Sequence, residues 1–557
     1  MDIYTGFALT GLAITLAILV VSVFRTRKGT QTTAKFFDAI GTFIDKYYLV
    51  FLFLIFAAYI VSRVYKLDSL PHGFHVDELS MAVDAKSIHN TGKDRWGVSY
   101  PAYLMNYGGG QNVLYIYIQA FLMNFLPDTI FAFRIQAVIW GAACLFAIFG
   151  ICYELTGSKG YSLIGPILVT VLPVYIMSER WGLEAYIFLP FSAIVMYSVI
   201  RAVKYERPLE WFIAGTLMGA SLYTYAVSYV VWPVFLLLGG IYLIVIGKLK
   251  IKNVVIFAIP LAILATPLIL FQLVNFGFLK PFKLGITEYV PLTEDRSNDL
   301  GFSHIISNLR FFKELFLGGE PLTYNSLREF GTIYMFLLPF VLIGLIMCIK
   351  DLIVSIREKR FEPGAFFFFF WLGGTFFMLL LNGPNVNRVN ELFMPFLLFI
   401  FMAVYRLLRN DAWALSWMAV WTCASFCFFM YFYLFLQDQV YGYHELHTSA
   451  SAGKAIMKSE AQYLKDENTH IYVLFEDHAF AKYQQVFYFA GGDDDVYSDD
   501  EATYGNVSGK LPAELDMNEN AVYIITDTLP HITSYLISEG FEADQTIPEY
   551  SILYRMN

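Results

Sequence analysis

Two adjacent carboxylates, Asp77 and Glu78, stand in the polar stretch LPHGFHVDELSMAVDA, which directly follows an apolar run over residues 47–65. A positioned carboxylate can take the proton of a hydroxyl group and so activate that oxygen as a nucleophile. Neighbouring residues of a helix point about 100° apart. The two acids therefore cannot face one cavity together, and we expect one to face a site while the other caps the first turn of the helix.

The spacing His75-x-x-Glu78 could hold a metal ion, but the sequence shows no third ligand beside it. The acidic stretch GGDDDVYSDDE lacks the spacing of a calcium loop and is interpreted as a solvated loop. A divalent metal is thus allowed by the chemistry but not indicated, and we expect no required cofactor. The cysteines all fall in apolar segments, which excludes a disulfide framework and a cysteine zinc site: Cys144, Cys152, Cys348, Cys423 and Cys427.

Further polar residues fall in segments that we expect on the same side of a membrane as Asp77 and Glu78. Several arginines near two carboxylates would suit an anionic lipid headgroup, whereas singly each arginine could simply reach toward lipid headgroups. The triglycine before Gln111 lacks the lysine of a phosphate-binding loop and is interpreted as a turn. The candidates for substrate binding are Arg180, Glu184, Arg328, Arg388, Gln111 and Asn112.

The elements that must position these residues are membrane helices. Of the 557 residues, 57% are hydrophobic and only 15% are charged, far fewer charges than a soluble protein carries. Apolar runs of about twenty residues predict about twelve transmembrane helices. They lie near residues 5–24, 47–65, 130–153, 160–179, 185–201, 209–229, 230–247, 253–273, 330–349, 363–381, 392–408 and 412–436. Residues 112–126 are too short for a further span and predict an interfacial or re-entrant helix.

Lysine and arginine in the short loops predict the orientation of these helices. Basic residues near 25–28, 201–207, 247–252, 357–360 and 406–409 can all be cytoplasmic if there are twelve spans. Residues 66–129, the turn at 180–184, 274–329, 382–391 and the chain after about 437 would then be extracytoplasmic. The prediction is a multi-pass protein of the cell membrane whose first outer loop and C-terminal part face outward.

Three regions follow from this pattern. Residues 1–46 hold an additional transmembrane helix and a cytoplasmic linker, and residues 47–436 hold the transmembrane domain with its large outer loop 66–129. Short strand-like runs in residues 437–557, such as IYVLF and AVYIITDT, predict a small soluble α/β domain. No basic tract suggests nucleic acid.

The motifs carry a family resemblance over roughly residues 47–410. PHGFHVDELSMAVDAKSIHNTGKDRWG, AFRIQAVIWG, PVYIMSERWGLEAY, YNSLREFGTIYMFLLPFVLIGL and NRVNELFMPFLLF occur in that order. Together they resemble the GT-C fold glycosyltransferases of the family 39 type, which are related to protein O-mannosyltransferases and aminoarabinose transferases. The resemblance implies Asp77 as catalytic base, with Glu78 as its acidic neighbour. It also implies that Arg180, Glu184 and, more loosely, Arg388 correspond to family positions in the second and last outer loops.

The function that the resemblance implies is transfer of a sugar from a polyprenyl-phosphate-linked donor to an acceptor hydroxyl, with inversion at the anomeric carbon of the sugar. The acceptor could be an envelope glycan, a lipid or a protein, and the sequence identifies neither it nor the sugar. Two other function classes stay open, namely a flippase or other transporter of lipid-linked sugars and a membrane-anchored sensor. Transporters tend to place ionisable groups near the middle of the bilayer, whereas here the acids cluster in outer loops.

Overall fold

The computed structural model is mostly helical, and it describes most of the chain. The described residues are 3–27, 35–71, 74–106, 109–293, 300–317, 325–327 and 330–435. Toward the C-terminus they are 447–448, 455, 458–459, 462–463, 469–474, 503–504, 507–508, 521–526, 529–547 and 550–555. The chain divides into two compact units. The first comprises residues 1–65, 135–273 and 292–442, and the second comprises residues 66–134, 274–291 and 443–557.

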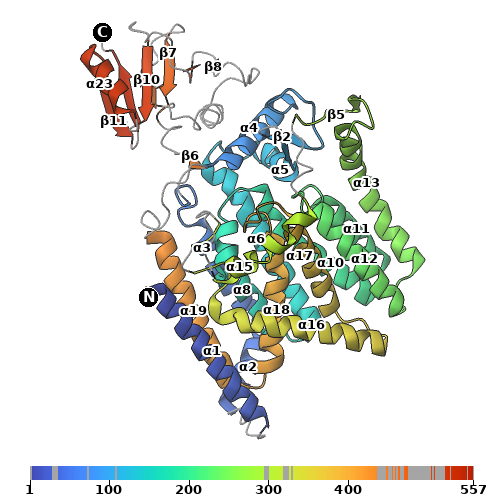
Figure 1. The fold of residues 1–557 in the computed structure, drawn as a ribbon. Helices are drawn as coiled ribbons and strands as arrows, with labels where there is room; N and C mark the ends of the chain where they lie inside the picture. The colour runs from blue at the N-terminus through green and yellow to red at the C-terminus, as the bar shows by residue number, and fades with distance from the viewer. Residues whose placement is uncertain are drawn as a thin grey trace. The chain divides into compact units, whose positions relative to one another are not determined.

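The first unit is a bundle of apolar helices (Figure 1). Its longer helices are α1 (Ile3–Arg27), α2 (Lys35–Lys46), α3 (Tyr48–Val64), α6 (Ile130–Thr156), α10 (Glu184–Tyr205), α11 (Pro208–Ser221), α12 (Ser228–Val245), α13 (Ile251–Asn275), α16 (Leu338–Glu358), α17 (Gly364–Leu380), α18 (Phe393–Leu408) and α19 (Ala412–Phe435). Its short helices are α7 (Lys159–Ser162), α8 (Ile164–Val171), α9 (Pro173–Ser178), η2 (Phe302–His304), α14 (Ile305–Asn308), α15 (Phe311–Leu317), η3 (Met335–Leu337) and η4 (Asn390–Leu392).

A helix lies at each of the twelve predicted spans. Among the described residues, eight helices are long and apolar enough to cross a membrane, and three more apolar helices are shorter: Tyr48–Val64, Lys159–Val171 and Gly364–Leu380. The remaining prediction, 209–229, corresponds to α11, which ends at Ser221 before a turn leads to α12 at Ser228. The chain is thus a polytopic membrane protein, and its number of spans stays a prediction.

Glycines allow two pairs of helices in the bundle to touch through their backbones. A Cβ atom on Gly344 of α16 would lie 2.0 Å from the carbonyl oxygen of Phe399 in α18. A Cβ atom on Gly215 of α11 would likewise lie 2.1 Å from the carbonyl oxygen of Phe257 in α13. Small residues at such crossings are the usual means of close helix packing in membranes, where burial of apolar side chains drives little association.

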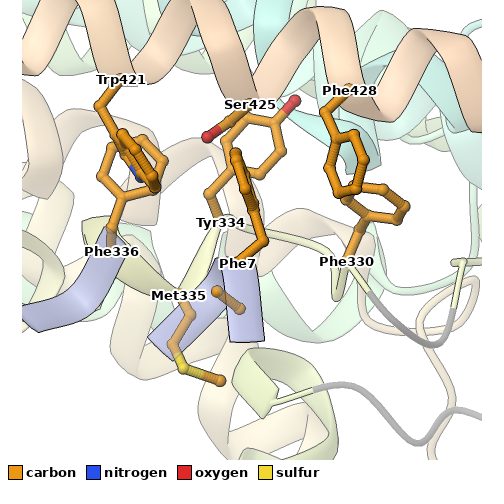
Figure 2. A pocket seen from close by; sticks show the side chains of 9 residues that line it. Phe7, Phe330, Tyr334, Met335, Phe336, Trp421, Ser425 and Phe428 are labelled. Atoms are coloured by element: carbon orange, nitrogen blue, oxygen red, sulfur yellow. The ribbon is translucent and has the colours of Figure 1, made fainter. Parts of the chain in front are cut away.

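The predicted additional helix α1 packs on the last apolar helix, α19. The ring of Phe7 stacks on that of Trp421 with centroids 4.9 Å apart, and it lies 4.7 Å from the ring of Phe428. These side chains, with Phe330 and Ser425 among others, line a small and mostly apolar pocket (Figure 2). These aromatic contacts join the first and the last helix of the transmembrane region.

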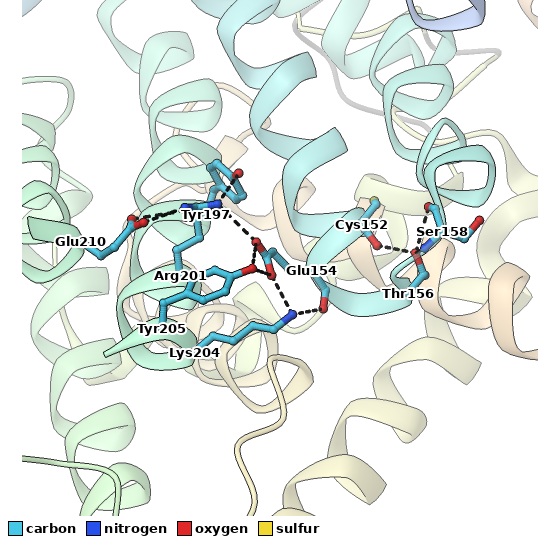
Figure 3. Close-up of polar contacts among 9 residues, drawn as sticks. All are labelled: Cys152, Glu154, Thr156, Ser158, Tyr197, Arg201, Lys204, Tyr205 and Glu210. Atoms are coloured by element: carbon cyan, nitrogen blue, oxygen red, sulfur yellow. Dashed lines mark hydrogen bonds and ion pairs between the residues drawn. The ribbon is translucent and has the colours of Figure 1, made fainter. Parts of the chain in front are cut away.

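Polar contacts connect loops that the charge pattern places on the same side. On the side predicted to be cytoplasmic, the Asp45 carboxylate accepts from the Gly160 N–H at 2.8 Å, and Lys248 pairs with Glu206 at 2.9 Å. Near the C-terminal end of α6, Glu154 pairs with Lys204 at 2.7 Å and accepts from the Tyr205 hydroxyl at 3.0 Å (Figure 3).

The loops predicted to be extracytoplasmic also contact one another. The Asn308 side chain donates to the Leu381 carbonyl at 2.6 Å, which ties the loop 274–329 to the end of α17. The Ser99 hydroxyl donates to the Ile286 carbonyl at 2.8 Å, which joins the loops 66–129 and 274–329. These contacts join loops that the charge pattern assigns to the same side of the membrane. Which side faces the cytoplasm stays a prediction.

The second unit combines the first outer loop with the C-terminal region. The loop folds into β1 (Phe74–His75), α4 (Val76–Thr91), the hairpin β2 (Leu104–Asn106) and β3 (Gly109–Gln111), and the short helix α5 (Leu114–Leu122). The hairpin β4 (Phe282–Leu284) and β5 (Thr287–Tyr289) adds to it. Helix α5 packs on α4 with Tyr115 and Ile116 buried and Phe121 exposed, so the short helix predicted within 112–126 is present.

The C-terminal region contains a mixed six-stranded sheet in the order β11-β12-β10-β7-β9-β8. Strands β7 (His470–Leu474) and β10 (Ala521–Thr526) are parallel, and β12 (Tyr550–Tyr554) is antiparallel to β10. The other elements are β6 (His447–Thr448), β8 (Thr503–Tyr504), β9 (Val507–Ser508), α23 (Pro530–Ser538) and β11 (Glu542–Ile547). Leu536 of α23 and Phe541 share a buried core with Tyr523 of β10. The predicted α/β domain is confirmed, while its acidic loop lies outside the described residues.

The close contact at Gly344 makes a testable prediction. Gly344→Ala should lower the free energy of unfolding by about 1–3 kcal/mol, because the added methyl group meets a backbone carbonyl that cannot rotate away. The measurement is the melting temperature of the purified protein in detergent. Gly240→Ala in α12 is the matched control, because nothing lies within 4 Å of its Cβ position. Equal melting temperatures for the two variants would contradict the packing argument.

Candidate functional site

The N-terminus of α4 is built by three polar residues of the first outer loop, His75, Asp77 and Glu78. His75 is the N-cap residue, and its Nδ1 atom accepts a hydrogen bond from the Asp77 N–H at 3.1 Å. In return the Glu78 carboxylate accepts from the His75 N–H at 3.0 Å, which completes a capping box. The capping role expected for one of the two acids is thus confirmed for Glu78.

Glu78 also forms a buried ion pair with Arg134, which lies in the first turns of α6. The guanidinium donates from Nε to Oε1 at 3.0 Å and from Nη2 to Oε2 at 2.9 Å, and both side chains are fully buried. The Nη1 atom of Arg134 donates to the carbonyls of Pro71 at 3.0 Å and of Leu67 at 3.3 Å. A two-pronged pair of this kind fixes both direction and distance, so it holds α4, the first residues of α6 up to Arg134 and residues 67–71 together. A catalytic role for Glu78 stays a prediction.

Asp77 has a different environment from its neighbour. Its side chain is 38% exposed, and its Oδ1 atom accepts a hydrogen bond from the Asn106 amide at 3.3 Å. The Oδ2 atom lies 3.7 Å from His75 Nδ1. Because that nitrogen accepts the Asp77 N–H, it has no proton to donate to the carboxylate. Of the two adjacent acids, only Asp77 therefore presents a carboxylate that a substrate hydroxyl could reach.

Gln111 and Asn112 lie in the same unit as Asp77 and are buried. The Ser80 hydroxyl donates to the Asp77 carbonyl at 3.1 Å and lies 3.5 Å from the Gln111 side-chain oxygen, so the hairpin end is held against α4. Gln111 is 2% exposed and Asn112 is 1% exposed. Their contact with a substrate stays a prediction, and their observed position supports the helix that carries Asp77.

Two buried acids behind Asp77 were not singled out from the sequence. Asp84 is fully buried on α4, and burial raises its pKa while the charge of Arg95 opposes that rise. Asp94 accepts at Oδ1 from the Trp96 and Val98 N–H groups at 2.9 and 2.8 Å. Burial, together with the charge of Asp84, raises the pKa of Asp94 to about 7. The spacing of Asp77 and Asp84, two helical turns apart, was the signal in the sequence that places both on one face.

Arg180, in the first unit, is fully buried and bonds to the backbone. Its guanidinium donates to the carbonyls of Arg63 at 2.6 Å, Ser62 at 3.0 Å and Tyr65 at 2.8 Å, which lie at the C-terminal end of α3 and at its C-cap residue. Arg63 in turn pairs with Glu179 at 2.9 Å and donates to the Thr170 carbonyl at 2.7 Å. The two arginines therefore stabilise helix C-termini, and a contact of Arg180 with substrate stays a prediction. Glu184 is half-buried as the first residue of α10.

The loop before α18 carries Arg388 and Glu391. Arg388 is half-buried, and its guanidinium donates to the Asn382 carbonyl at 3.1 Å. Glu391 is fully buried against Gly374 of α17, and within the described part of the chain neither of its carboxylate oxygens has a hydrogen-bond partner. A buried ionisable residue at the start of a membrane helix is a functional candidate by its energetic cost alone. Arg328, like His72, lies outside the described residues.

A metal site was left open by the sequence. Over the residues that the structure describes, no group of three or more histidine, cysteine, aspartate or glutamate side chains could hold a metal ion.

Comparison with a protein family points to sugar transfer. Residues 111–272 match a family model described as dolichyl-phosphate-mannose-protein mannosyltransferase. No curated protein sequence matches the chain.

Comparison with solved structures identifies the fold. ArnT from Cupriavidus metallidurans in the apo state superposes with a TM-score of 0.57 at 10% identity, covering 91% of this chain and 97% of that chain. The same enzyme bound to undecaprenyl phosphate gives a TM-score of 0.53 at 10% identity, with 91% and 98% covered. The oligosaccharyltransferase of Archaeoglobus fulgidus in complex with Zn and sulfate gives 0.51 at 13% identity, covering 78% of this chain and 61% of that one. This chain thus spans less than two thirds of the archaeal protein. The matches show that the chain has the GT-C fold, and with the family model they support a glycosyltransferase.

The Glu78–Arg134 pair predicts different effects for two conservative substitutions. Glu78→Gln should lower the free energy of unfolding by roughly 3–5 kcal/mol, because it leaves the buried Arg134 without its counter-charge. Asp77→Asn, at the partly exposed neighbouring position, should change it by less than about 0.5 kcal/mol. Thermal unfolding of both variants in the same detergent measures the difference. Similar melting temperatures for both would show that the ion pair does not stabilise the fold.

The raised pKa of Asp94 predicts a pH effect on stability. Because the folded protein holds the Asp94 proton up to about pH 7 and an unfolded chain releases it near 4, this group favours folding less as the pH rises through that interval. Asp94→Asn keeps the Oδ1 acceptor and removes the titration. Between pH 4.5 and pH 8, the melting temperature of the Asp94→Asn variant should rise relative to that of the wild type as the pH increases. A constant difference between the two would contradict the assignment.

Proposed function

We propose that this chain, whose membrane region has the GT-C fold, is a membrane glycosyltransferase that takes its sugar from a polyprenyl-phosphate-linked donor. The observation that carries the proposal is the unequal use of the two acids at the start of α4. Glu78 is buried in an ion pair, whereas the Asp77 carboxylate is partly exposed with one oxygen that accepts no hydrogen bond from a described residue. A single accessible carboxylate is what a displacement with one general base needs.

The reaction would be one displacement at the anomeric carbon of the sugar. Asp77 takes the proton of an acceptor hydroxyl while that oxygen bonds to the anomeric carbon. The bond from that carbon to the phosphate oxygen breaks, and the lipid phosphate leaves with its electron pair. The configuration of the sugar inverts, because the acceptor enters opposite to the phosphate. The leaving phosphate is already an anion, so no acid has to protonate it, and one base suffices.

A cation would stabilise the departing phosphate. Among the predicted arginines, Arg388 has a half-buried guanidinium, whereas Arg180 is fully buried and donates to the carbonyls of α3. Of these two arginines, Arg388 therefore stays the candidate that the sequence predicted for the phosphate contact. The donor is proposed on two grounds, since the matching family model names a dolichyl-phosphate sugar and the ArnT structure holds undecaprenyl phosphate.

The acceptor is a hydroxyl group of an envelope glycan, lipid or protein, and the transfer takes place on the extracytoplasmic side. The C-terminal sheet domain shares its compact unit with the loop that carries Asp77. Strand β6 of the C-terminal region pairs with β1, directly before the capping residues of α4. We infer from this shared unit that the C-terminal region takes part in acceptor choice.

Asp77→Asn should abolish sugar transfer while the protein still inserts into the membrane and unfolds at the wild-type temperature, because the amide cannot take a proton. The assay uses purified protein in detergent with polyprenyl-phosphate mannose as the first donor and other polyprenyl-phosphate hexoses after it. Release of polyprenyl phosphate that depends on an added envelope extract is the signal. Mass spectrometry of envelope glycans from cells that carry either form of the gene extends the test to donors outside this panel.

The outcomes separate the enzyme from a transporter. Wild-type turnover by Asp77→Asn would exclude Asp77 as the base. Absence of transfer by the wild type in both assays, together with movement of the lipid-linked sugar across vesicles that contain the protein, would instead indicate a flippase.

A further inference from the structure

A row of buried polar residues runs along α4 behind the proposed base. Asp77 and Asp84 lie seven residues apart, which is two helical turns or about 10 Å along one face of the helix. Asp77 is partly exposed, whereas Asp84 is fully buried. The segment after α4 supplies two residues, Arg95 and Asn106, that connect the two acids. Both are buried, with exposed fractions of 4% and 9%.

The connection is continuous. The backbone N–H of Arg95 donates to Asp84 Oδ1 at 3.1 Å, and its Nε atom lies 3.8 Å from the same oxygen. The Nη2 atom of Arg95 donates to Asn106 Oδ1 at 2.8 Å. The Nδ2 atom of Asn106 then donates to Asp77 Oδ1 at 3.3 Å. We name this row, Asp84–Arg95–Asn106–Asp77, the carboxylate chain.

Each residue type in the carboxylate chain sets the direction of the next hydrogen bond. An asparagine amide has one face that accepts and one that donates, and it can rotate by 180°. A guanidinium only donates and stays charged, so Arg95 must face the oxygen of Asn106. The NH2 group of Asn106 is thereby directed at Asp77. Asp84 holds Arg95 from the other end, where burial strengthens the attraction between the two charges.

We propose that Asn106 is a positioning residue for Asp77, held in its working orientation by Arg95 and Asp84. Its hydrogen bond occupies Oδ1 and fixes the orientation of the carboxylate, and it leaves Oδ2 to receive the proton of the acceptor. The inference rests on the proposed function, since it assigns a role around the same base. It adds three residues that neither the motifs nor the comparisons single out.

Asn106→Asp tests the proposal with a change of one atom. The new carboxylate still accepts from Arg95, so the fold keeps that contact and the variant should still unfold cooperatively. Toward Asp77, however, a donor is replaced by an acceptor of like charge. We expect kcat to fall on the order of 10- to 100-fold, within the range that general-base catalysis contributes. The KM for the donor should change by less than about threefold, since only the transition state is affected.

A second pair of variants tests whether Arg95 acts through Asn106. Arg95→Lys keeps a positive charge near Asp84 but loses the forked donor, and kcat should fall several-fold. In the Asn106→Ala background the same change should have no further effect, because residues of one chain do not contribute independently. Ser99→Ala is the matched control, since its hydroxyl bonds to the Ile286 carbonyl in the same unit away from the chain. It should leave kcat unchanged.

The result that overturns the proposal is an Asn106→Asp variant with wild-type kcat, or fully additive losses for Arg95→Lys and Asn106→Ala. A separate measurement covers the case in which the proposed function itself fails and the wild type transfers no sugar. Loss of the Asn106 amide uncovers Oδ1 of Asp77, so labelling of Asp77 by a water-soluble carbodiimide, followed by peptide mass spectrometry, should increase in Asn106→Ala relative to wild type and to Ser99→Ala. Equal labelling in all three would refute the carboxylate chain without reference to activity.

Discussion

The buried pair of Glu78 and Arg134 is the interaction on which the candidate site depends. It places a negative and a positive charge where neither contacts water, and such a pair is tolerated only when its hydrogen bonds are satisfied. Here the carboxylate also accepts from the N-cap residue, and the guanidinium also donates to two carbonyls of residues 67–71. The start of α4 is thus fixed in direction, and Asp77 is presented beside it with little freedom in its backbone. The contacts of Glu78 thus hold in place the helix turn that carries the proposed base, Asp77.

Much of the fold could be predicted from the sequence because it depends on composition and length. Apolar runs predicted a helix at every one of twelve positions, and alternating strand-like runs predicted the C-terminal sheet. The end of α11 was predicted too far along the chain. Tyr223 and Thr224 are compatible with a helix by hydropathy, but side-chain hydrogen bonds of Ser221 and Thr224 to nearby carbonyls accompany its end. Such local competition with the helical hydrogen bonds is invisible to a hydropathy average.

The candidate site was predicted in part. The position of two acids after an apolar run indicated both a cap and an accessible carboxylate, and the structure distinguishes them as Glu78 and Asp77. The sequence could not assign Arg134 as the partner of Glu78, because 56 residues separate them and an arginine near a span is usually expected to reach toward headgroups. The sequence likewise could not show that the Arg180 guanidinium donates to backbone carbonyls at the end of α3, and its contact with a substrate stays a prediction. Hydrogen-bonding partners that lie far apart in the sequence are brought together by helix packing, which a single sequence does not reveal.

The seven-residue spacing between Asp77 and Asp84 has a consequence for how this region can vary. Substitutions on the opposite side of α4 leave the spacing intact, but insertion or deletion of one residue between the two acids rotates one against the other by about 100°. Arg95 and Asn106 could then no longer reach both. The segment from 77 to 84 should therefore accept no change of length, so that gaps in any set of natural variants would fall outside it. In this region the length of the helix between Asp77 and Asp84 fixes the distance and the angle between the two carboxylates.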